Sequence, residues 1–138
     1  MNVAFWKNKR VLITGHTGFK GSWLSMWLQK VGAIVIGYAL SPPSQPSIFD
    51  ICKIAEKIIS INGDVREIKH LKNVFTEYNP EIVFHMAAQS LVRLSYEKPI
   101  ETYETNVMGT VNLLEVCRHT PSVKAIVNVT SDKCYENK

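Results

Sequence analysis

Three glycines follow an aliphatic run at three-residue intervals: Gly15, Gly18 and Gly21 come directly after the segment 10–14. Glycine adopts positive φ angles without strain and lets a ligand or another backbone approach closely. The helix expected from Lys20 onward would turn its free N–H groups and the positive end of its dipole toward this loop. A strand, a glycine loop and a helix together predict a site for an anionic group such as a pyrophosphate, although the same glycines also suit a local turn.

Apolar runs alternate with helical patterns along the rest of the chain. Short aliphatic runs predict buried strands at 10–14, 33–40, 57–61, 81–88 and 123–131. Apolar residues at helical spacing predict helices between them, on Leu24, Trp27, Leu28 and Val31, on Ile68, Leu71, Val74, Phe75 and Tyr78, and on Val107, Val111 and Leu114. This alternation predicts an α/β fold, a Rossmann-type doubly wound parallel sheet in a three-layer α/β/α arrangement.

Composition narrows the classes of protein that fit. The chain has 138 residues, is 46% hydrophobic and carries a formal charge of +4, which suits one domain without a nucleic-acid-binding surface. Cys52, Cys117 and Cys134 are widely spaced and form no CxxC pair, so we expect neither a disulfide framework nor a metal site. The N-terminus lacks a signal-peptide pattern, and no apolar run is long enough to span a bilayer. We therefore expect a cytoplasmic protein without a membrane partner.

The spacing Gly-x-x-Gly-x-x-Gly is similar to the fingerprint of short-chain dehydrogenases/reductases, especially their extended branch. The segments NGDVRE (62–67), HMAAQ (85–89) and TNVMGT (105–110) also resemble motifs of that branch. The resemblance implies that a nicotinamide dinucleotide binds at the carboxyl edge of the sheet. The implied cofactor contacts are Gly15, Thr17, Gly18, Phe19, Lys20, Gly21, Ser41, Asp64, Val65, Ala87, Ala88, Gln89 and Thr130.

Several of these residues also have a purely structural interpretation. The resemblance places Asp64 and Val65 against the adenine, but Asp64 also suits the N-cap of the following helix. Asn106 lies near the active site in the family, yet a helical Asn can simply bind backbone. NAD-specific members carry an acid after the second strand, where this chain has GYALSPP with Ser41 and neither an acid nor an arginine. NAD is favoured over NADP on the family match alone.

The segment TSDKCY (130–135) is similar to the catalytic segment of sugar-nucleotide 4,6-dehydratases, with Lys133 in place of the usual Glu. The resemblance implies NAD-dependent conversion of a nucleotide sugar, CDP-glucose, to its 4-keto-6-deoxy form. Ser131 would hold the C4 oxygen, and Asp132 would protonate the departing C6 hydroxyl. Lys133 acts as a base only when neutral, and otherwise orients a water or stabilises an enolate. A solvated Asp–Lys pair in a loop is the structural alternative.

The family's catalytic Tyr-x-x-x-Lys pair has no match in this chain, because Tyr135 and Lys138 are one residue too close. We therefore expect residues 1–138 to be the N-terminal, NAD-binding part of a longer enzyme, without its substrate-binding lobe and without turnover alone. By the same resemblance, helices flanking the fourth and fifth strands would pair in a homo-oligomer. Two alternatives remain: a dehydratase or epimerase for another nucleotide sugar, and a non-catalytic NAD-binding module.

Overall fold

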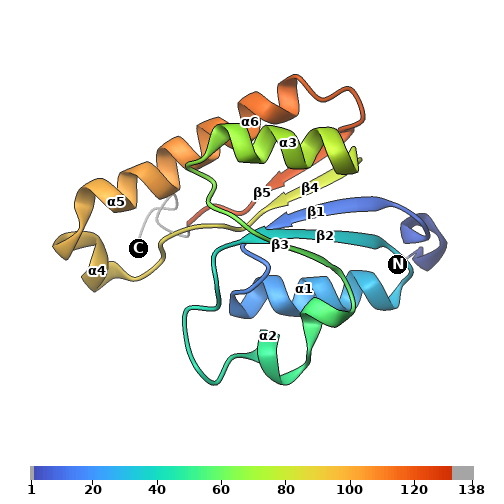
Figure 1. The fold of residues 1–138 in the computed structure, drawn as a ribbon, viewed down its shortest axis with the longest axis horizontal. Coiled ribbons are helices and arrows are strands. Elements are labelled where there is room, and N and C mark those ends of the chain that lie inside the picture. Colours follow the sequence, from blue (N-terminus) through green and yellow to red (C-terminus); the bar gives the residue numbers. More distant parts are fainter. Residues whose placement is uncertain (1, 132–138) are drawn as a thin grey trace, which may run out of the picture.

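The computed structural model describes residues 2–131, and its centre is a five-stranded parallel sheet (Figure 1). The strands are β1 (Arg10–Thr14), β2 (Ile34–Ala39), β3 (Ile59–Asn62), β4 (Ile82–His85) and β5 (Ala125–Asn128). Their order is β3-β2-β1-β4-β5, and each neighbouring pair is parallel. The chain thus builds the sheet from β1 in one direction and then places β4 on the other side of β1. Ligands of open α/β sheets bind at the carboxyl ends of the strands beside such a reversal.

Helices cover both faces of this sheet. The helices α1 (Phe19–Lys30) and α2 (Ile48–Ile51) lie on one face, and α3 (Ile68–Tyr78) and α6 (Gly109–Arg118) lie on the other (Figure 1). Two short helices, α4 (Val92–Glu97) and α5 (Pro99–Tyr103), extend past the carboxyl edge and lead through the π-helix η3 (Glu104–Met108) into α6. The segments η1 (Val3–Trp6) and η2 (Ile54–Glu56) are short 3-10 helices. The predicted doubly wound, three-layer fold is confirmed.

Two apolar clusters hold the layers together, one on each face of the sheet. Successive residues of a strand point to opposite faces, so β1 contributes to both clusters. Val11 and Ile13 pack on the α1 side, with Leu28, Ala33, Val35 and Ile82. Leu12 packs on the α3 and α6 side, with residues that include Ile36, Leu71, Phe75, Val83 and Leu113. Because β1 is buried on both faces, its sequence is a continuous apolar run rather than an alternating one.

Two of the predicted apolar helical faces differ in part from the faces that the structure buries. In α6 the side chains toward the sheet include Leu113, Val116 and Cys117, whereas Val111 is 50% exposed. In α1 the predicted residues Leu24, Leu28 and Val31 do pack on the cluster of that side, whereas Trp27 is 44% exposed. The buried positions also include the small residues Gly21, Ser22 and Ser25. Small residues let α1 approach the sheet closely, so this helix is held by backbone proximity as much as by aliphatic side chains.

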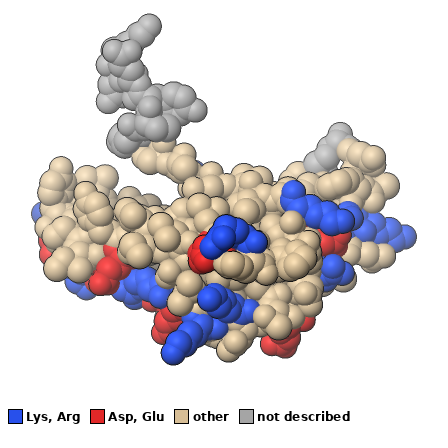
Figure 2. Space-filling model, turned by 90° about the horizontal axis from the view of Figure 1, so that it is seen from above, with Lys and Arg blue, Asp and Glu red and all other residues tan. Residues whose placement is uncertain are grey.

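The surface of the described chain shows no single-sign region on the side drawn in Figure 2, where basic and acidic side chains are interspersed. Within residues 2–131, no helix is both long and apolar enough to cross a membrane. Over the same residues, no group of three or more His, Cys, Asp or Glu side chains is placed to hold a metal ion.

Candidate functional site

The three glycines of the β1–α1 loop have different structural roles. Gly15 has a φ of +76°, and a Cβ on it would lie 2.8 Å from the backbone of Met86 and Ala87. A Cβ on Gly21 would collide with the carbonyl oxygen of Gly15. A Cβ on Gly18 would meet only that same oxygen, at an ordinary 3.4 Å. Gly15 and Gly21 are therefore required by the fold itself, whereas packing leaves Gly18 free to serve a ligand.

The amino end of α1 has the features of an anion site. Gly18 is the N-cap of this helix, and no side chain caps the helix there. The first-turn N–H groups, from Phe19 onward, have no intrahelical acceptor, and the helix dipole adds positive potential at the same end. Phe19 and Lys20 are exposed. This end of α1 can therefore hold a negatively charged group through backbone donors.

The same loop contacts the end of β2. The hydroxyl of Thr17 donates a hydrogen bond to the carbonyl oxygen of Leu40, at 2.9 Å. Ser41, which follows, is exposed. The structure therefore brings the predicted residues Thr17 and Ser41 to neighbouring strand ends.

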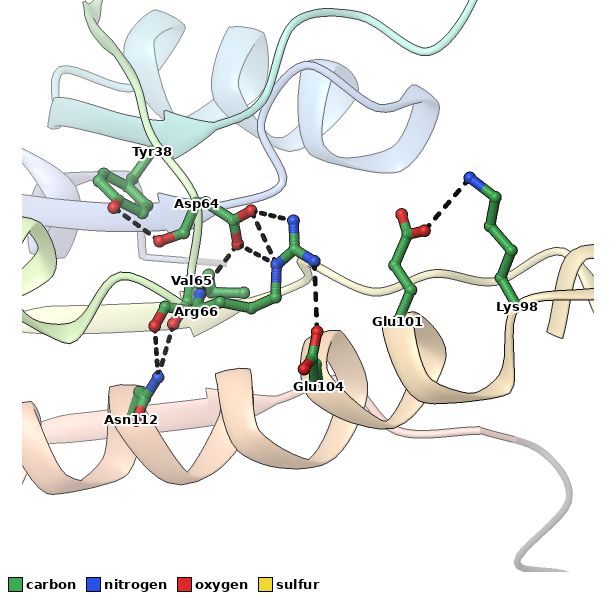
Figure 3. Close-up of polar contacts among 8 residues, drawn as sticks. All are labelled: Tyr38, Asp64, Val65, Arg66, Lys98, Glu101, Glu104 and Asn112. Atoms are coloured by element: carbon green, nitrogen blue, oxygen red, sulfur yellow. Dashed lines mark hydrogen bonds and ion pairs between the residues drawn. The ribbon is translucent and has the colours of Figure 1, made fainter.

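The turn between β3 and α3 is held at three successive carbonyl groups (Figure 3). Tyr38 donates from its hydroxyl to the Asp64 carbonyl at 2.9 Å, and Asn112 Nδ2 donates to the carbonyls of Val65 and Arg66 at 3.1 Å each. Burial, followed by the charges of Glu67 and Asp64, raises the pKa of Tyr38 to about 12, so its hydroxyl stays protonated as a donor. The turn is rigid because both β2 and α6 bind its backbone.

Asp64 is not the N-cap of α3, so the structural interpretation of this residue as a cap is wrong. The helix begins at Ile68, and its N-cap is Glu67. The Asp64 carboxylate instead accepts the backbone N–H of Arg66 at 2.9 Å and the Arg66 guanidinium. These hydrogen bonds hold the pKa of Asp64 below its usual range. The side chain is therefore an ionised, oriented acceptor at the carboxyl edge.

The N–H of Val65 is left available beside that carboxylate. Val65 is 4% exposed, and its Cγ2 packs so closely on α6 that a Cβ on Gly109 would lie 2.6 Å from it. No hydrogen bond among the described residues uses the Val65 N–H. A backbone donor in such a position calls for an acceptor from a ligand. A carboxylate next to a free N–H matches a group that presents a donor beside an acceptor, as the amine and ring nitrogen of adenine do.

A buried histidine joins β1, β4 and α6 beneath the site. Thr14 Oγ1 accepts the N–H groups of Met86 and Ala87, both at 3.1 Å, and lies 2.7 Å from His85 Nδ1. Since both lone pairs of this hydroxyl are used, its hydrogen goes to Nδ1. His85 then donates from Nε2 to Thr110 Oγ1 at 3.0 Å. The network requires neutral His85, in agreement with a pKa that burial lowers to about 4.

The turn after β4 is clamped by the π-helix η3. Asn106 Oδ1 accepts the backbone N–H of Gln89 at 2.8 Å, and Asn106 Nδ2 donates to the Gln89 carbonyl at 2.9 Å. The Gln89 side chain bonds the backbone of Leu91 and the hydroxyl of Thr102. Asn106 therefore binds backbone, and through it orders the turn that contains the predicted residues Ala87, Ala88 and Gln89.

The end of β5 lies beside the end of β4, since Val129 donates from its backbone to the His85 carbonyl at 3.0 Å. Thr130 and Ser131 follow there and are exposed. The predicted residues Asp132 and Lys133, and the Tyr135–Lys138 pair, lie outside the described residues. The described candidates thus all lie at one edge of the sheet, on the loops that follow its five strands.

Sequence patterns gave no sign of several residues that shape this edge. His16 is buried at 1% exposure, with Nε2 2.8 Å from Ser60 Oγ. Thr14 lies in none of the quoted motifs, and the resemblance gave no role to His85 in HMAAQ or to Arg66 in NGDVRE. A threonine ending one strand opposite a histidine ending the next would have been a usable hint, once β1 and β4 are known to be neighbours.

Known proteins share this fold and much of this sequence. The family model described as GDP-mannose 4,6 dehydratase matches residues 12–137. A CDP-glucose 4,6-dehydratase of Salmonella typhimurium is 61% identical over 97% of this chain and 37% of that protein. UDP-glucuronate 4-epimerase 1 of Arabidopsis thaliana is 35% identical over 91% of this chain and 30% of that protein.

Solved structures also resemble this chain. The UDP-glucose-4-epimerase of Stenotrophomonas maltophila, with bound NAD, superposes with a TM-score of 0.82 at 26% identity, over 95% of this chain and 39% of that one. The UDP-glucose 4-epimerase of Brucella ovis, in complex with NAD, gives a TM-score of 0.74 at 29% identity, over 87% and 35%. The chain spans roughly a third of the length of these relatives. By the family match over residues 12–137, the chain belongs to the GDP-mannose 4,6 dehydratase family.

Proposed function

We propose that this chain binds NAD across the carboxyl edge of its sheet, as the cofactor-binding part of a nucleotide-sugar 4,6-dehydratase. The observation that carries the proposal is the pairing of two ligand-ready features at that edge. One is the uncapped amino end of α1 behind Gly18, which suits a pyrophosphate. The other is the Val65 N–H beside the Asp64 carboxylate, which suits an adenine.

The shape of the loop fits a dinucleotide that lies against the backbone. A side chain on Gly18 would occupy space that packing leaves open, and the small residues Ala87 and Ala88 lie across from the loop at the end of β4. The proposed contacts are those that the resemblance implies: Gly15, Thr17, Gly18, Phe19, Lys20, Gly21, Ser41, Asp64, Val65, Ala87, Ala88, Gln89 and Thr130. NAD is supported over NADP by the NAD-bound structures that this chain resembles.

Calorimetric titration of the purified chain tests this proposal. We expect NAD to bind, and NADP to bind more weakly. Gly18→Ala should weaken NAD binding by about tenfold or more, because a methyl group takes the place of a phosphate oxygen. Lys69→Ala, on the exposed side of α3, is a control that should leave the affinity unchanged. An unchanged NAD affinity in the Gly18 variant, or no binding by the wild type, would contradict the proposal.

The substrate that we propose is CDP-glucose, with CDP-4-keto-6-deoxyglucose and water as the products. The support is the relative of 61% identity, which is a CDP-glucose 4,6-dehydratase. NAD, when bound, would supply a reversible hydride acceptor for oxidation at C4 and reduction at C6. Over the cycle the C4 hydroxyl gives up one proton, C5 loses a proton and regains one, and the C6 hydroxyl takes up one proton and leaves as water. A dehydratase or epimerase for another nucleotide sugar is the second candidate, favoured by the epimerases among the relatives.

The residues proposed for this chemistry follow β5. The Ser131 hydroxyl would donate to the C4 oxygen of the sugar. Asp132, in its acid form, would give its proton to the C6 oxygen as that oxygen leaves. Lys133 would stabilise the enolate, or act as the base if its surroundings keep it neutral.

We also propose that residues 1–138 are one part of a two-lobed enzyme and do not turn over substrate alone. The share of the relatives that the chain spans, 37% for the dehydratase, supports this. Mass spectrometry of the chain incubated with NAD and CDP-glucose should show no loss of water from the sugar. Formation of the 4-keto-6-deoxy product would contradict the two-lobe proposal while leaving NAD binding intact.

A further part of the proposal is that two copies pair through the outer side of α5, η3 and α6. An apolar stripe runs along these helices, on Ile100, Tyr103, Val107, Val111 and Leu114, with exposures between 42% and 75%. An almost wholly apolar hollow on this stripe contains none of the proposed cofactor contacts. Sedimentation should show a dimer that Val111→Glu converts to a monomer.

We propose a cytoplasmic localisation. The free thiols of Cys52 and Cys117 fit the reducing conditions of the cytoplasm.

A further inference from the structure

We propose that Arg66 is a positioning residue for cofactor recognition: anchored by Glu104, its guanidinium fixes the Asp64 carboxylate so that it accepts a hydrogen bond from the exocyclic amine of adenine. This inference rests on the proposed binding of NAD at the Asp64–Val65 turn. It adds two residues that no motif assigned, and it explains how the turn tells an amine from a carbonyl group.

The Arg66 side chain folds back onto Asp64, two residues earlier in the chain (Figure 3). Its Nε lies 3.0 Å from Asp64 Oδ1 and 2.8 Å from Oδ2, and Nη2 also binds Oδ2. The backbone N–H of Arg66 donates to Oδ1 at 2.9 Å. Both carboxylate oxygens are therefore held by one residue, in a fork that only an arginine supplies.

These contacts leave room for one more donor on the carboxylate. An ionised carboxylate offers about four lone-pair sites and no hydrogen of its own. Three N–H groups of Arg66 bind it through four contacts, because the Nε hydrogen is shared between Oδ1 and Oδ2 while the backbone N–H binds Oδ1 and Nη2 binds Oδ2. Three hydrogens therefore meet about four lone-pair sites. One acceptor site remains for a ligand, and it can receive an amine but repels a carbonyl oxygen. The Asp64 side chain is only 11% exposed, so without Arg66 it would lose its counter-charge in a largely buried place.

Arg66 is itself held from across the site. Its Nη1 lies 3.7 Å from Glu104 Oε2, on η3, and Asn112 on α6 binds the Arg66 carbonyl (Figure 3). The Arg66–Glu104 pair thus links the β3–α3 turn to the π-helix that also clamps the β4 turn through Asn106. The pair is half-exposed, so by itself it contributes little to folding stability. Its effect is on the orientation of the guanidinium, and through it on Asp64.

The test compares NAD with its deamino analogue, in which hypoxanthine replaces adenine and a carbonyl oxygen replaces the amine. We expect the wild-type chain to bind NAD about tenfold more tightly than deamino-NAD. Arg66→Met should weaken NAD binding and reduce this preference to about threefold or less. Arg66→Lys, which keeps the charge without the fork, should give an intermediate preference. Glu104→Gln should reduce the preference by a smaller factor.

Lys98→Met is the matched control. Lys98 is the N-cap of α5 and pairs with Glu101 of that helix at 3.3 Å, but it makes no contact with Asp64 (Figure 3). Both affinities should stay at the wild-type values in this variant. A general loss of charge would lower both affinities together, whereas loss of the carboxylate's orientation changes their ratio.

The outcomes separate this inference from the proposed function. If the wild type binds no NAD, the proposed function and the role of Arg66 are both overturned. If it binds NAD and Arg66→Met keeps the wild-type preference for the amine, the role of Arg66 falls and NAD binding stands. If circular dichroism shows that Arg66→Met does not fold, Arg66→Lys and Glu104→Gln decide: a reduced preference supports the inference, and an unchanged one overturns it.

Discussion

The hydroxyl of Thr14 lies 2.7 Å from Nδ1 of His85, at the point where β1 and β4 end side by side. Thr14 is fully buried, and the same oxygen accepts two backbone N–H groups from the turn after β4. One side chain therefore fixes the turn, the tautomer of the histidine and the relative position of the two strands that border the proposed cofactor site.

Replacing Thr14 with valine should destabilise the fold by about 3 kcal/mol, because the Ala87 N–H and one imidazole nitrogen of His85 lose their partner. The Met86 N–H would keep only the Thr14 carbonyl, at 3.2 Å. Thr110→Val is the matched control, since it removes only the bond to His85 Nε2 and the one to the Asn106 carbonyl. It should cost about 1 kcal/mol. Urea unfolding measures both. Equal effects of the two substitutions would contradict the central place of Thr14.

Stability should fall as the pH drops from 6.5 toward 4. Burial lowers the pKa of His16 and of His85 from 6.5 to about 4. Between these values the unfolded chain binds protons that the folded chain does not, so protonation favours unfolding. Each histidine should remove up to about 3 kcal/mol by pH 4. Urea midpoints at pH 7, 6 and 5 test the slope, and His16→Gln should halve it. A stability that is flat over this range would refute the account.

Substitutions of Gly21 and Gly18 should have different effects, the first on folding stability and the second on NAD binding. Gly21→Ala places a methyl group against the Gly15 carbonyl, which cannot move without disturbing β1, so it should cost about 3 kcal/mol of stability. Gly18→Ala meets only an ordinary contact and should change stability by less than about 1 kcal/mol, while it weakens NAD binding. Thermal unfolding and NAD titration of both variants check the pattern. A reversed pattern would mean that Gly18, and not Gly21, supports the packing.

His16 and Gly37 should be energetically coupled. A Cβ on Gly37 would overlap the His16 ring, so Gly37→Ala should destabilise the chain by about 3 kcal/mol. His16→Ala removes the obstacle at the cost of a cavity. The double variant should lose at least about 1 kcal/mol less stability than the sum of the losses in the two single variants. Additive costs would show that the ring and the strand do not compete for the same space.

Much of the fold can be predicted from the sequence because β1, β2 and β4 are buried on both faces and appear as unbroken aliphatic runs. The glycine loop could be predicted equally well, since the positive φ of Gly15 and the crowding at Gly21 exclude every residue type except glycine at these positions. The helix α6 was harder to predict. Val107, Val111 and Leu114 are as apolar as Leu113 and Val116, and only the sheet decides which face is buried.

The details of the site were less accessible from sequence. Thr14 and His85 are separated by 71 positions, and Arg66 reaches Glu104 across the sheet edge. Neither pair makes a local pattern. The alternative interpretation of Asp64 as a helix cap rested on its position alone, but Arg66 binds its carboxylate and the helix begins later, at Ile68. Such contacts become visible only when the strand order is known.

The most direct test of the central claim is a crystal structure of this chain with NAD. We expect the pyrophosphate at the amino end of α1, bound by first-turn N–H groups next to Gly18, in this structure. We also expect the adenine at the β3–α3 turn, with hydrogen bonds to the Val65 N–H and the Asp64 carboxylate. NAD bound elsewhere, or with its adenine away from Asp64 and Val65, would contradict the central claim.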